Sequence, residues 1–270
     1  MPDACVSRYE NAAEIALHVV PLPALADNYI WLLHDDSGDA IVVDPGEAAP
    51  VEAALNARKL TLRAVLLTHH HPDHIGGADR LRETYDVPVY APDDDRIAVA
   101  THRVKDGETL SLPHPLARFD IIAVPGHTLS HIVYVGEGVL LCGDTLFSLG
   151  CGRLFEGTPA QMLSSLQRLA SLSGDTLVCC GHEYTAANGR FAQTIEPDNA
   201  ALKHRLDEVA SLRADHRPSV PVTLSSELAC NPFLRVDSAA VVDWCRRHGS
   251  ANDAVARFAA LRSAKDVFQA

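Results

Sequence analysis

Short apolar runs that end at turn residues recur along the first two-thirds of the chain, and this pattern predicts a series of β-strands. The predicted strands cover 15–22, 29–34, 40–43, 64–68, 87–91, 119–124, 132–135, 139–142 and 176–180. The runs 132–135 and 139–142 form a predicted hairpin across Gly136-Glu137-Gly138. Helices are predicted over 47–59, 76–85 and 159–172, the last with a proline near its first turn.

The pattern changes after about residue 185, where strands largely give way to helices. Helices are predicted over 186–195, 199–216, 238–248 and 252–263, and only 222–228 is predicted to be extended. The change predicts a layered α/β domain over 1–184, followed by a smaller, mostly helical domain over 185–270.

Histidine or aspartate residues follow closely after the ends of four predicted strands. These candidate residues are His69, His71, Asp73, His74, His127, Asp144 and His182. In layered α/β proteins, ligand and catalytic groups gather in loops beyond the strand ends, where the scaffold holds them rigidly. We therefore expect these side chains to form one site.

The candidate residues are metal ligands by type, because zinc, iron and manganese all accept imidazole nitrogen and carboxylate oxygen. Seven such ligands are too many for one tetrahedral ion but suit two ions that share a carboxylate. A structural zinc site would be closed and rich in cysteine, whereas the cysteines here lie outside these motifs. The sequence therefore predicts a catalytic two-metal centre. We expect His70 to face away from it. His131, four residues after His127, is either a partner of the ligands or an ordinary buried residue, and we favour the second.

The charge of the chain limits its partners. The net charge of −12 argues against nucleic acid, because phosphate binding depends on clustered Lys and Arg. An anionic substrate would need a local basic patch to overcome this charge. No apolar run approaches the roughly 18 residues that span a bilayer, so no membrane partner is expected. At 270 residues the chain can bury a substantial core without disulfides or a structural metal. We expect a monomer.

Cysteine use and the N-terminal residues predict a cytoplasmic protein. Residues 1–10 show no basic segment followed by an apolar stretch, so no secretory signal is expected. The seven cysteines are scattered without a repeated CxxC spacing, which predicts no disulfide framework. A reducing compartment fits such a chain.

Four ordered motifs carry a resemblance to a known superfamily. They are His69-x-His71-x-Asp73-His74, Pro125-Gly126-His127-Thr128, Gly143-Asp144-Thr145-Leu146-Phe147 and Gly181-His182-Glu183-Tyr184-Thr185. Together they resemble the motifs of the metallo-β-lactamase superfamily. The flanking residues are similar specifically to the glyoxalase II (hydroxyacylglutathione hydrolase) family. This similarity runs nearly from end to end and includes 27–29, 151–153, 231–235 and 262–266.

The resemblance implies a fold and a set of site residues. The fold would be an αββα sandwich of two facing sheets with outer helices, followed by the helical domain. The first metal would be held by His69, His71 and His127, the second by Asp73, His74 and His182, with Asp144 as the bridge. Zinc is the expected ion, and iron or manganese fits the same ligands. Glutathione would be bound by Arg153, Tyr184, Arg262 and Lys265.

The resemblance also implies the reaction, which is hydrolysis of S-D-lactoylglutathione to D-lactate and glutathione in methylglyoxal detoxification. Two ions that share a solvent molecule lower its pKa enough to supply hydroxide, which would attack the thioester carbonyl. The leaving thiol has a pKa of about 8.5, so it departs without a strong general acid. The catalytic roles therefore fall on metal ligands, above all His71, Asp73 and Asp144, with Asp73 orienting the hydroxide.

One residue departs from the family pattern, and two other activities share most of the motifs. Phe155 stands where some members of the family carry a tyrosine, and we expect Arg153 to offset the missing hydroxyl. A glutathione persulfide dioxygenase would use a single iron, and His182 in its Gly-His-Glu-Tyr setting opposes that function. A lactonase or β-lactamase would keep the metals without needing the glutathione-binding residues.

Overall fold

The computed structural model describes residues 17–249 and 253–269. Residues 1–10, from which we predicted the absence of a secretory signal, lie outside these ranges, as do the first residues of the predicted 15–22 strand and 252–263 helix. Among the helices that the described ranges contain, none has the length and apolar character needed to cross a bilayer.

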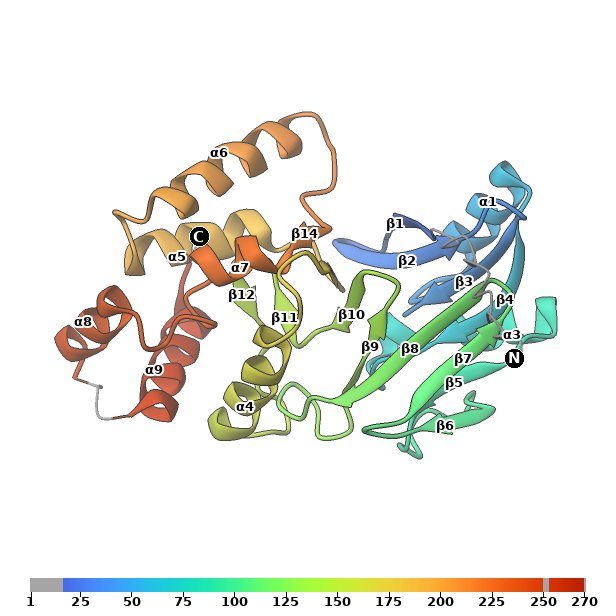
Figure 1. The fold of residues 1–270 in the computed structure, drawn as a ribbon, viewed down its shortest axis with the longest axis horizontal. Coiled ribbons are helices and arrows are strands. Elements are labelled where there is room, and N and C mark those ends of the chain that lie inside the picture. Colours follow the sequence, from blue (N-terminus) through green and yellow to red (C-terminus); the bar gives the residue numbers. More distant parts are fainter. Residues whose placement is uncertain (1–16, 250–252, 270) are drawn as a thin grey trace, which may run out of the picture.

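Two six-stranded sheets form the centre of the molecule and face one another (Figure 1). The first has the order β1-β2-β3-β4-β5-β6, with β1 His18–Ala24, β2 Asn28–His34, β3 Asp39–Val43, β4 Thr61–Leu66, β5 Val89–Pro92 and β6 His102–Val104. The second has the order β14-β13-β10-β9-β8-β7, with β7 Thr109–Pro113, β8 Leu116–Ala123, β9 Ile132–Gly136, β10 Val139–Gly143, β13 Leu177–Cys180 and β14 Val222–Thr223.

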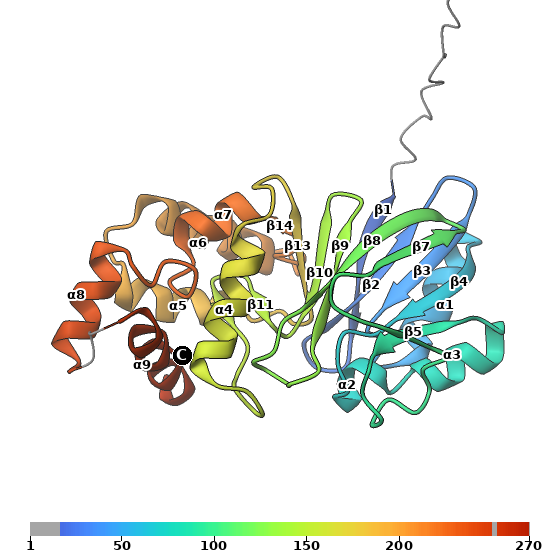
Figure 2. The same ribbon diagram turned by 60° about the horizontal axis from the view of Figure 1, so that its bottom comes forward.

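Strand β2 shows why the layers form, because it is buried on both of its faces. Trp31 and Leu33 lie in the core between the sheets, which also contains Phe119 of β8. Ile30 and Leu32 alternate with them and lie in a separate apolar cluster on the other face. That cluster includes residues of α1 (Ala48–Arg58) and α3 (Ala78–Tyr85), which cover the outer side of the first sheet (Figure 2).

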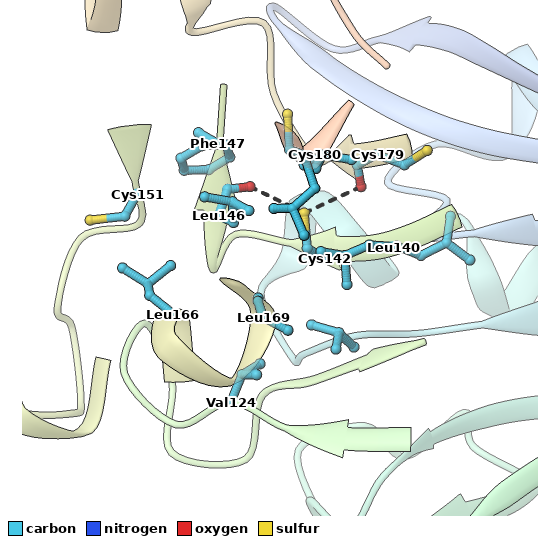
Figure 3. Close-up of a cluster of buried hydrophobic side chains, with 14 of the residues drawn as sticks. Val124, Leu140, Cys142, Leu146, Phe147, Cys151, Leu166, Leu169, Cys179 and Cys180 are labelled. Carbon is cyan, nitrogen blue, oxygen red and sulfur yellow. Dashed lines mark hydrogen bonds between the residues drawn. The ribbon is translucent and has the colours of Figure 1, made fainter. Parts of the chain in front are cut away.

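Helix α4 (Pro159–Ala170) packs against the second sheet. Thr158 and Gln161 form a capping box at its start, and Pro159 occupies the first turn. Figure 3 shows Leu166 and Leu169 of this helix directed toward the end of β10. Helices therefore cover both sheets, and the expected αββα sandwich is confirmed.

The C-terminal part of the chain is mostly helical and lies at one end of the molecule, beyond α4 (Figure 1). Its helices are α5 Thr185–Ile195, α6 Ala200–Ala214, α7 Leu224–Cys230, α8 Ala239–Arg247 and α9 Ala254–Val267. Asn199, Ser238 and Asp253 cap α6, α8 and α9 by accepting hydrogen bonds from backbone amides of the first turn. Helix α9 packs against α4 and so joins this part to the sandwich.

The predicted elements are present with ends shifted by a few residues, but the sequence analysis missed several short ones. The missed elements are β6, β7, β11 Leu146–Phe147, β12 Gly150–Cys151 and the short helix α2 Pro72–Ile75. Strand β7 alternates exposed and buried residues at the edge of its sheet, so it contains no continuous apolar run. Edge strands and single turns therefore escape a search for apolar runs.

The prediction that 222–228 is extended was wrong beyond its first two residues. Only β14 is extended, and α7 begins at Leu224. The Thr223 side chain caps this helix by accepting a hydrogen bond from the amide of Ser226. The run Val-Pro-Val-Thr-Leu looks like a strand because the apolar residues before and after the cap happen to alternate.

The helical part is not wholly separate from the sandwich. Strand β14 pairs with β13, where Val222 lies opposite Val178 and Thr223 lies opposite Leu177. A segment from beyond residue 185 thus completes the edge of the second sheet. The division into domains over 1–184 and 185–270 stays a prediction.

A buried carboxylate joins α7 to the β11–β12 hairpin. Glu227 is fully buried and accepts hydrogen bonds from the Ser148 hydroxyl (2.7 Å), the Leu149 amide (2.8 Å) and the Asn231 side chain (2.9 Å). The Asn231 amide also donates to the carbonyl of Phe147 at 3.1 Å. The hairpin is therefore held from the helical side, and it carries residues of the cavity described below.

Replacing this carboxylate should weaken the fold strongly. Glu227→Ala leaves the buried Ser148 hydroxyl and Leu149 amide without this acceptor and removes one contact of Asn231, so we expect the free energy of unfolding to fall by about 3 kcal/mol. Urea denaturation followed by circular dichroism measures the change. Glu83→Ala, on the exposed face of α3, is the control and should stay within about 0.5 kcal/mol. Equal losses in both variants would contradict the prediction.

Candidate metal centre

A single tight turn places four candidate ligands. His69 and His71 follow β4, and His71 is the residue that precedes the first turn of α2. Pro72 starts that turn, and the His74 amide donates to the His71 carbonyl at 2.9 Å. The turn supplies ligands to two groups: His69 and His71 lie with His127, and Asp73 and His74 lie with His182.

His69, His71 and His127 form the first group, with ligand atoms that all lie within 4.8 Å of one another. His71 Nδ1 lies 3.1 Å from His69 Nε2 and 3.0 Å from His127 Nε2. Burial holds the pKa of His69 well below its usual value, and burial together with His127 lowers the pKa of His71 to about 4. All three rings converge as neutral imidazoles near pH 7, the form that binds metals.

Asp73, His74 and His182 form the second group within the same 4.8 Å limit. An Asp73 carboxylate oxygen lies 3.5 Å from His74 Nε2 and 3.4 Å from His182 Nε2. His182 arrives from the loop after β13, so this group, like the first, draws on two distant parts of the chain.

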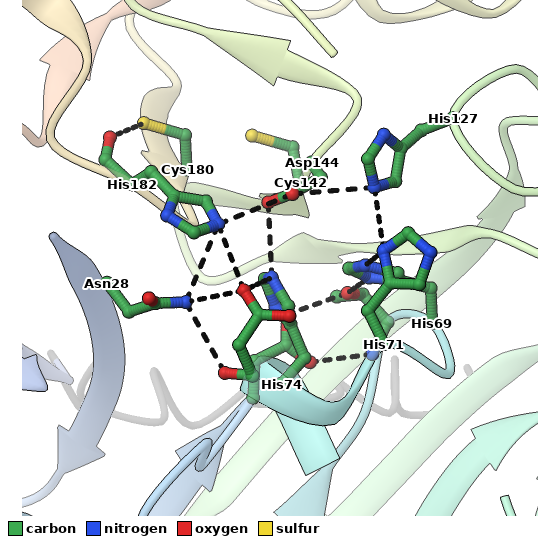
Figure 4. Close-up of polar contacts among 12 residues, drawn as sticks. Asn28, His69, His71, His74, His127, Cys142, Asp144, Cys180 and His182 are labelled. Atoms are coloured by element: carbon green, nitrogen blue, oxygen red, sulfur yellow. Dashed lines mark hydrogen bonds and ion pairs between the residues drawn. The ribbon is translucent and has the colours of Figure 1, made fainter. Parts of the chain in front are cut away.

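Asp144 lies between the two groups (Figure 4). One carboxylate oxygen is 3.3 Å from His74 Nε2, and the other is 3.4 Å from both His127 Nε2 and His182 Nε2. Burial alone would raise the pKa of Asp144, but His74 and His182 outweigh it and hold that pKa well below its usual value. The structure therefore brings all seven predicted ligands together, with an ionised carboxylate at the centre.

Two polar atoms at this centre support the presence of a cation. Asp144 Oδ1 and His74 Nε2 are buried without a hydrogen-bond partner, although each faces the other ligands. Such atoms are costly to bury unpaired, and a divalent ion would provide their missing partner. The donor set of imidazoles and carboxylates therefore fits divalent metal.

Several supporting residues were missed from the sequence. Asp27 accepts a hydrogen bond from His182 Nδ1 at 2.8 Å, and Asp44 lies 3.0 Å from His74 Nδ1. Asp44 directly follows β3, so it repeats the strand-then-aspartate pattern and was recognisable. His131 does more than fill the core, because it stacks on the His69 ring at 4.5 Å and accepts a hydrogen bond from the Asp144 amide.

His70 turns away from the centre, as expected. Its ring nitrogens lie 3.6 Å from carboxylate oxygens of Asp94 and Glu156. Those carboxylates belong to a separate charged junction on the outer side of the turn.

A cavity of about 450 Å³ opens onto the ligands. His127 and Asp144 lie in its wall, and the other lining residues are Phe147, Cys151, Arg153, Phe155, Tyr184, Ala187, Asn188, Arg262, Lys265 and Phe268. All four residues predicted to bind glutathione are therefore present. The Tyr184 ring stacks on His182 with centroids 4.7 Å apart, and Phe155 is 64 % exposed beside His71.

The basic residues of the cavity differ in their freedom to bind a ligand. Arg262 is buried, donates to the Cys151 carbonyl at 2.8 Å and pairs with Asp266 at 3.0 Å. Lys265 lies near aromatic rings, and burial with the neighbouring Arg262 and Arg153 lowers its pKa. Arg153 is 64 % exposed at the cavity, and its Nε lies 3.7 Å from the carboxylate of Asp266. A positive patch thus exists in a protein of net charge −12.

Family models match nearly the whole chain. The metallo-beta-lactamase superfamily model covers residues 26–182, and the model named hydroxyacylglutathione hydrolase C-terminus covers 183–268. Among solved structures, the BLEG-1 B3 metallo-beta-lactamase has a TM-score of 0.62 at 25% identity, over 80% of this chain and 99% of its own. ETHE1 from Myxococcus xanthus has a TM-score of 0.56 at 25% identity, over 80% of this chain and 99% of its own. The chain therefore has the fold of the metallo-beta-lactamase superfamily.

Curated relatives define the family more narrowly. A hydroxyacylglutathione hydrolase of Xanthomonas campestris pv. campestris is 50% identical over 257 residues, covering 94% of this chain and 100% of that protein. One from Cupriavidus metallidurans is 49% identical over 267 residues, with the same coverage of both chains. The chain therefore belongs to the hydroxyacylglutathione hydrolase family.

The hydrogen bond from His182 to Asp27 should affect metal binding. Asp27→Ala removes the acceptor that orients the His182 ring, and we expect the affinity for Zn²⁺ to fall about tenfold or more. Competition with a chromophoric chelator measures it. Asp36→Ala is the matched control, since Asp36 makes an equal 2.8 Å contact to His18 away from the cluster. Unchanged affinity in Asp27→Ala would contradict the role assigned to this bond.

Proposed function

We propose that this protein hydrolyses S-2-hydroxyacylglutathiones, with S-D-lactoylglutathione as the substrate and D-lactate and glutathione as products, in methylglyoxal detoxification. The observation that carries the proposal is the cavity itself, because Asp144 and His127 of the ligand cluster share its wall with Arg153, Arg262 and Lys265. A thioester with an anionic peptide tail matches this combination of groups.

The ligand cluster supports binding of two divalent ions. His69, His71 and His127 would hold one ion, Asp73, His74 and His182 the other, and Asp144 would contact both. Zinc suits these donors, and iron or manganese accepts the same ones. When bound, the two ions would lower the pKa of a shared solvent molecule and polarise the thioester carbonyl.

Asp73 is placed to orient the solvent molecule. Its side chain is 37 % exposed, so one part of the carboxylate stays accessible beside the cluster. The Asn28 amide donates to it at 3.0 Å, and the His182 contact keeps the pKa of Asp73 below its usual value. The carboxylate therefore accepts a hydrogen bond from the attacking solvent and aims it at the carbonyl carbon.

The cavity residues bind the glutathione portion of the substrate. Arg153 and Lys265 offer charge to its carboxylates, and Tyr184 offers its ring and hydroxyl beside His182. Arg262 supports this wall through the Cys151 carbonyl and adds positive potential. Phe155 is exposed and lacks the hydroxyl group that a tyrosine would offer at this position. Arg153 is therefore the residue that makes polar contact with the substrate on this side of the cavity.

We also propose that the protein works as a monomer in the cytoplasm. All the cavity and cluster residues come from a single chain, so a second copy is not required to complete the site. The described cysteines are free and buried, which suits a reducing compartment.

Thioester hydrolysis tests the function directly. Purified, metal-loaded protein should hydrolyse S-D-lactoylglutathione, followed as the loss of thioester absorbance, and should contain about two ions per chain. His71→Ala and Asp144→Ala should each lose at least a thousandfold in kcat, roughly the loss expected when a group essential to the reacting centre is removed. His102→Ala, an exposed histidine away from the cluster, should retain activity. If the protein instead contains one iron per chain and consumes oxygen when glutathione persulfide is added, it is a dioxygenase and the proposed hydrolase function is wrong.

The Arg153 side chain should contribute to substrate affinity. Arg153→Ala should raise KM for the thioester about fivefold with little change in kcat, because a charge-assisted contact to a carboxylate is lost. The backbone carbonyl of Arg153, which accepts a hydrogen bond from His127 at 2.9 Å, is retained in this variant. Arg153→Lys keeps the charge and should recover part of the affinity. An unchanged KM in Arg153→Ala would show that Arg153 does not offset the missing hydroxyl at Phe155.

A further inference from the structure

A junction of charged side chains lies outside the cavity, on the outer side of the His69–His71 turn. Arg96 donates to both carboxylate oxygens of Asp94, at 2.8 and 2.7 Å, and to Glu156 at 2.5 Å. Neither the arginine nor its two partners line the cavity. The junction is therefore not explained by contact with substrate.

The junction ties together three segments that are distant in the sequence. Asp94 and Arg96 lie between β5 and β6 of the first sheet, and Glu156 lies between β12 and α4. Glu156 also accepts a hydrogen bond from the Leu129 amide at 2.7 Å, and Asp94 accepts one from the Ser130 hydroxyl at 2.5 Å. Residues 129 and 130 belong to the loop between β8 and β9, which carries His127.

Residues 153–157, which we call the wall segment, are the part of the cavity most dependent on this junction. The segment supplies Arg153 and Phe155 to the cavity. Its backbone is attached to the His127 loop by four hydrogen bonds. The amides of Phe155 and Glu156 donate to the His127 carbonyl at 3.3 and 3.4 Å, the Gly157 amide donates to the Gly126 carbonyl at 3.0 Å, and His127 Nδ1 donates to the Arg153 carbonyl at 2.9 Å. The two bonds to the His127 carbonyl are long and therefore weak, so the Glu156 side chain strengthens the attachment at the middle of the segment.

The charges of the junction persist at neutral pH. Hydrogen bonds from Arg96 are the main cause of a lowered pKa at both Asp94 and Glu156, so both carboxylates stay ionised. An isolated surface ion pair contributes little, but a planar guanidinium that is bidentate on one carboxylate and bridges to a second is geometrically constrained. Lysine cannot reproduce that arrangement.

We propose that Arg96 is a positioning residue, which bridges Asp94 and Glu156 and thereby holds the wall segment against the His127 loop in the geometry that binds the glutathione thioester. This inference rests on the proposed function for its substrate. The contacts of Arg96 predict an effect on substrate affinity rather than on the chemical step, because the ligand cluster does not include it.

Steady-state kinetics and amide hydrogen exchange test the proposal together. Arg96→Ala should raise KM for S-D-lactoylglutathione about fivefold, equivalent to about 1 kcal/mol, while kcat changes by less than about twofold. Amides of the wall segment should exchange faster in the same variant, because their attachment to the His127 loop is loosened. Arg96→Lys should lie close to Arg96→Ala in both measurements.

Arg80→Ala is the matched control. Arg80 is likewise bidentate on a carboxylate, that of Glu52, at 2.8 Å for both bonds, and joins α1 to α3 on the outer side of the first sheet. It should leave KM and exchange in the wall segment unchanged. Glu156→Gln provides a second route to the same loss, since the amide keeps the shape and removes the charge.

The outcomes separate this proposal from the proposed function. If wild-type protein does not hydrolyse the thioester, the function fails, while the exchange comparison still tests the attachment of the wall segment. If wild-type protein is active and both Arg96→Ala and Glu156→Gln match Arg80→Ala in KM and exchange, Arg96 has no positioning role. A loss of kcat alone, with unchanged KM and exchange, would overturn the proposal as well.

Discussion

The site depends on one buried carboxylate, Asp144, held among three imidazoles. An ionised carboxylate is costly to bury, and only close partners of suitable charge compensate that cost. His74 of α2 and His127 and His182 of two separate loops lie within 3.4 Å of its oxygens. Their convergence at one carboxylate links the two ligand groups into a single centre.

Two glycines make that convergence possible. Gly143, just before Asp144, has φ of +47°, and a Cβ there would lie 2.4 Å from the Thr68 hydroxyl. A Cβ on Gly181, just before His182, would lie 2.6 Å from Asp144 Oδ1. A side chain at Gly143 would therefore displace Thr68 behind the site, and one at Gly181 would displace the Asp144 carboxylate itself. Gly143 and Gly181 are therefore needed for the close packing of the ligands, and not for flexibility of the chain.

How much of the site the sequence predicted depends on whether its residues have a local signature. The seven ligands have one, since each follows a strand end within a few residues, and the layered fold brings those ends together. Asp27 has no such local pattern, because its partner His182 is 155 residues away in the sequence. Arg96 has none either, because its partner Glu156 is 60 residues away. The residues proposed to bind glutathione were predicted from the family resemblance alone.

The fold was predicted with the same limitation. Strands buried on both faces were located because they contain a continuous apolar run, as 29–33 in β2, whereas the half-exposed edge strand β7 was missed. Helix α7 was predicted as extended because its start depends on capping by Thr223, and its buried Glu227 finds partners only in the distant β11–β12 hairpin. The periodicity of apolar residues predicts which positions are buried. It does not predict the burial of a polar side chain, because that depends on partners that only the folded structure brings close.

The positive patch explains how an acidic protein can accept an anionic substrate. Its charges come from two separate parts of the chain, Arg153 before α4 and both Arg262 and Lys265 on α9. The lowered pKa of Lys265 has burial as its main cause, with the like-charged Arg262 and Arg153 beside it. Asp266 partly balances these charges, because it lies 3.0 Å from Arg262 and 3.7 Å from Arg153. Since two of the three basic residues lie on α9, the positive character of the cavity depends on the packing of α9 against α4.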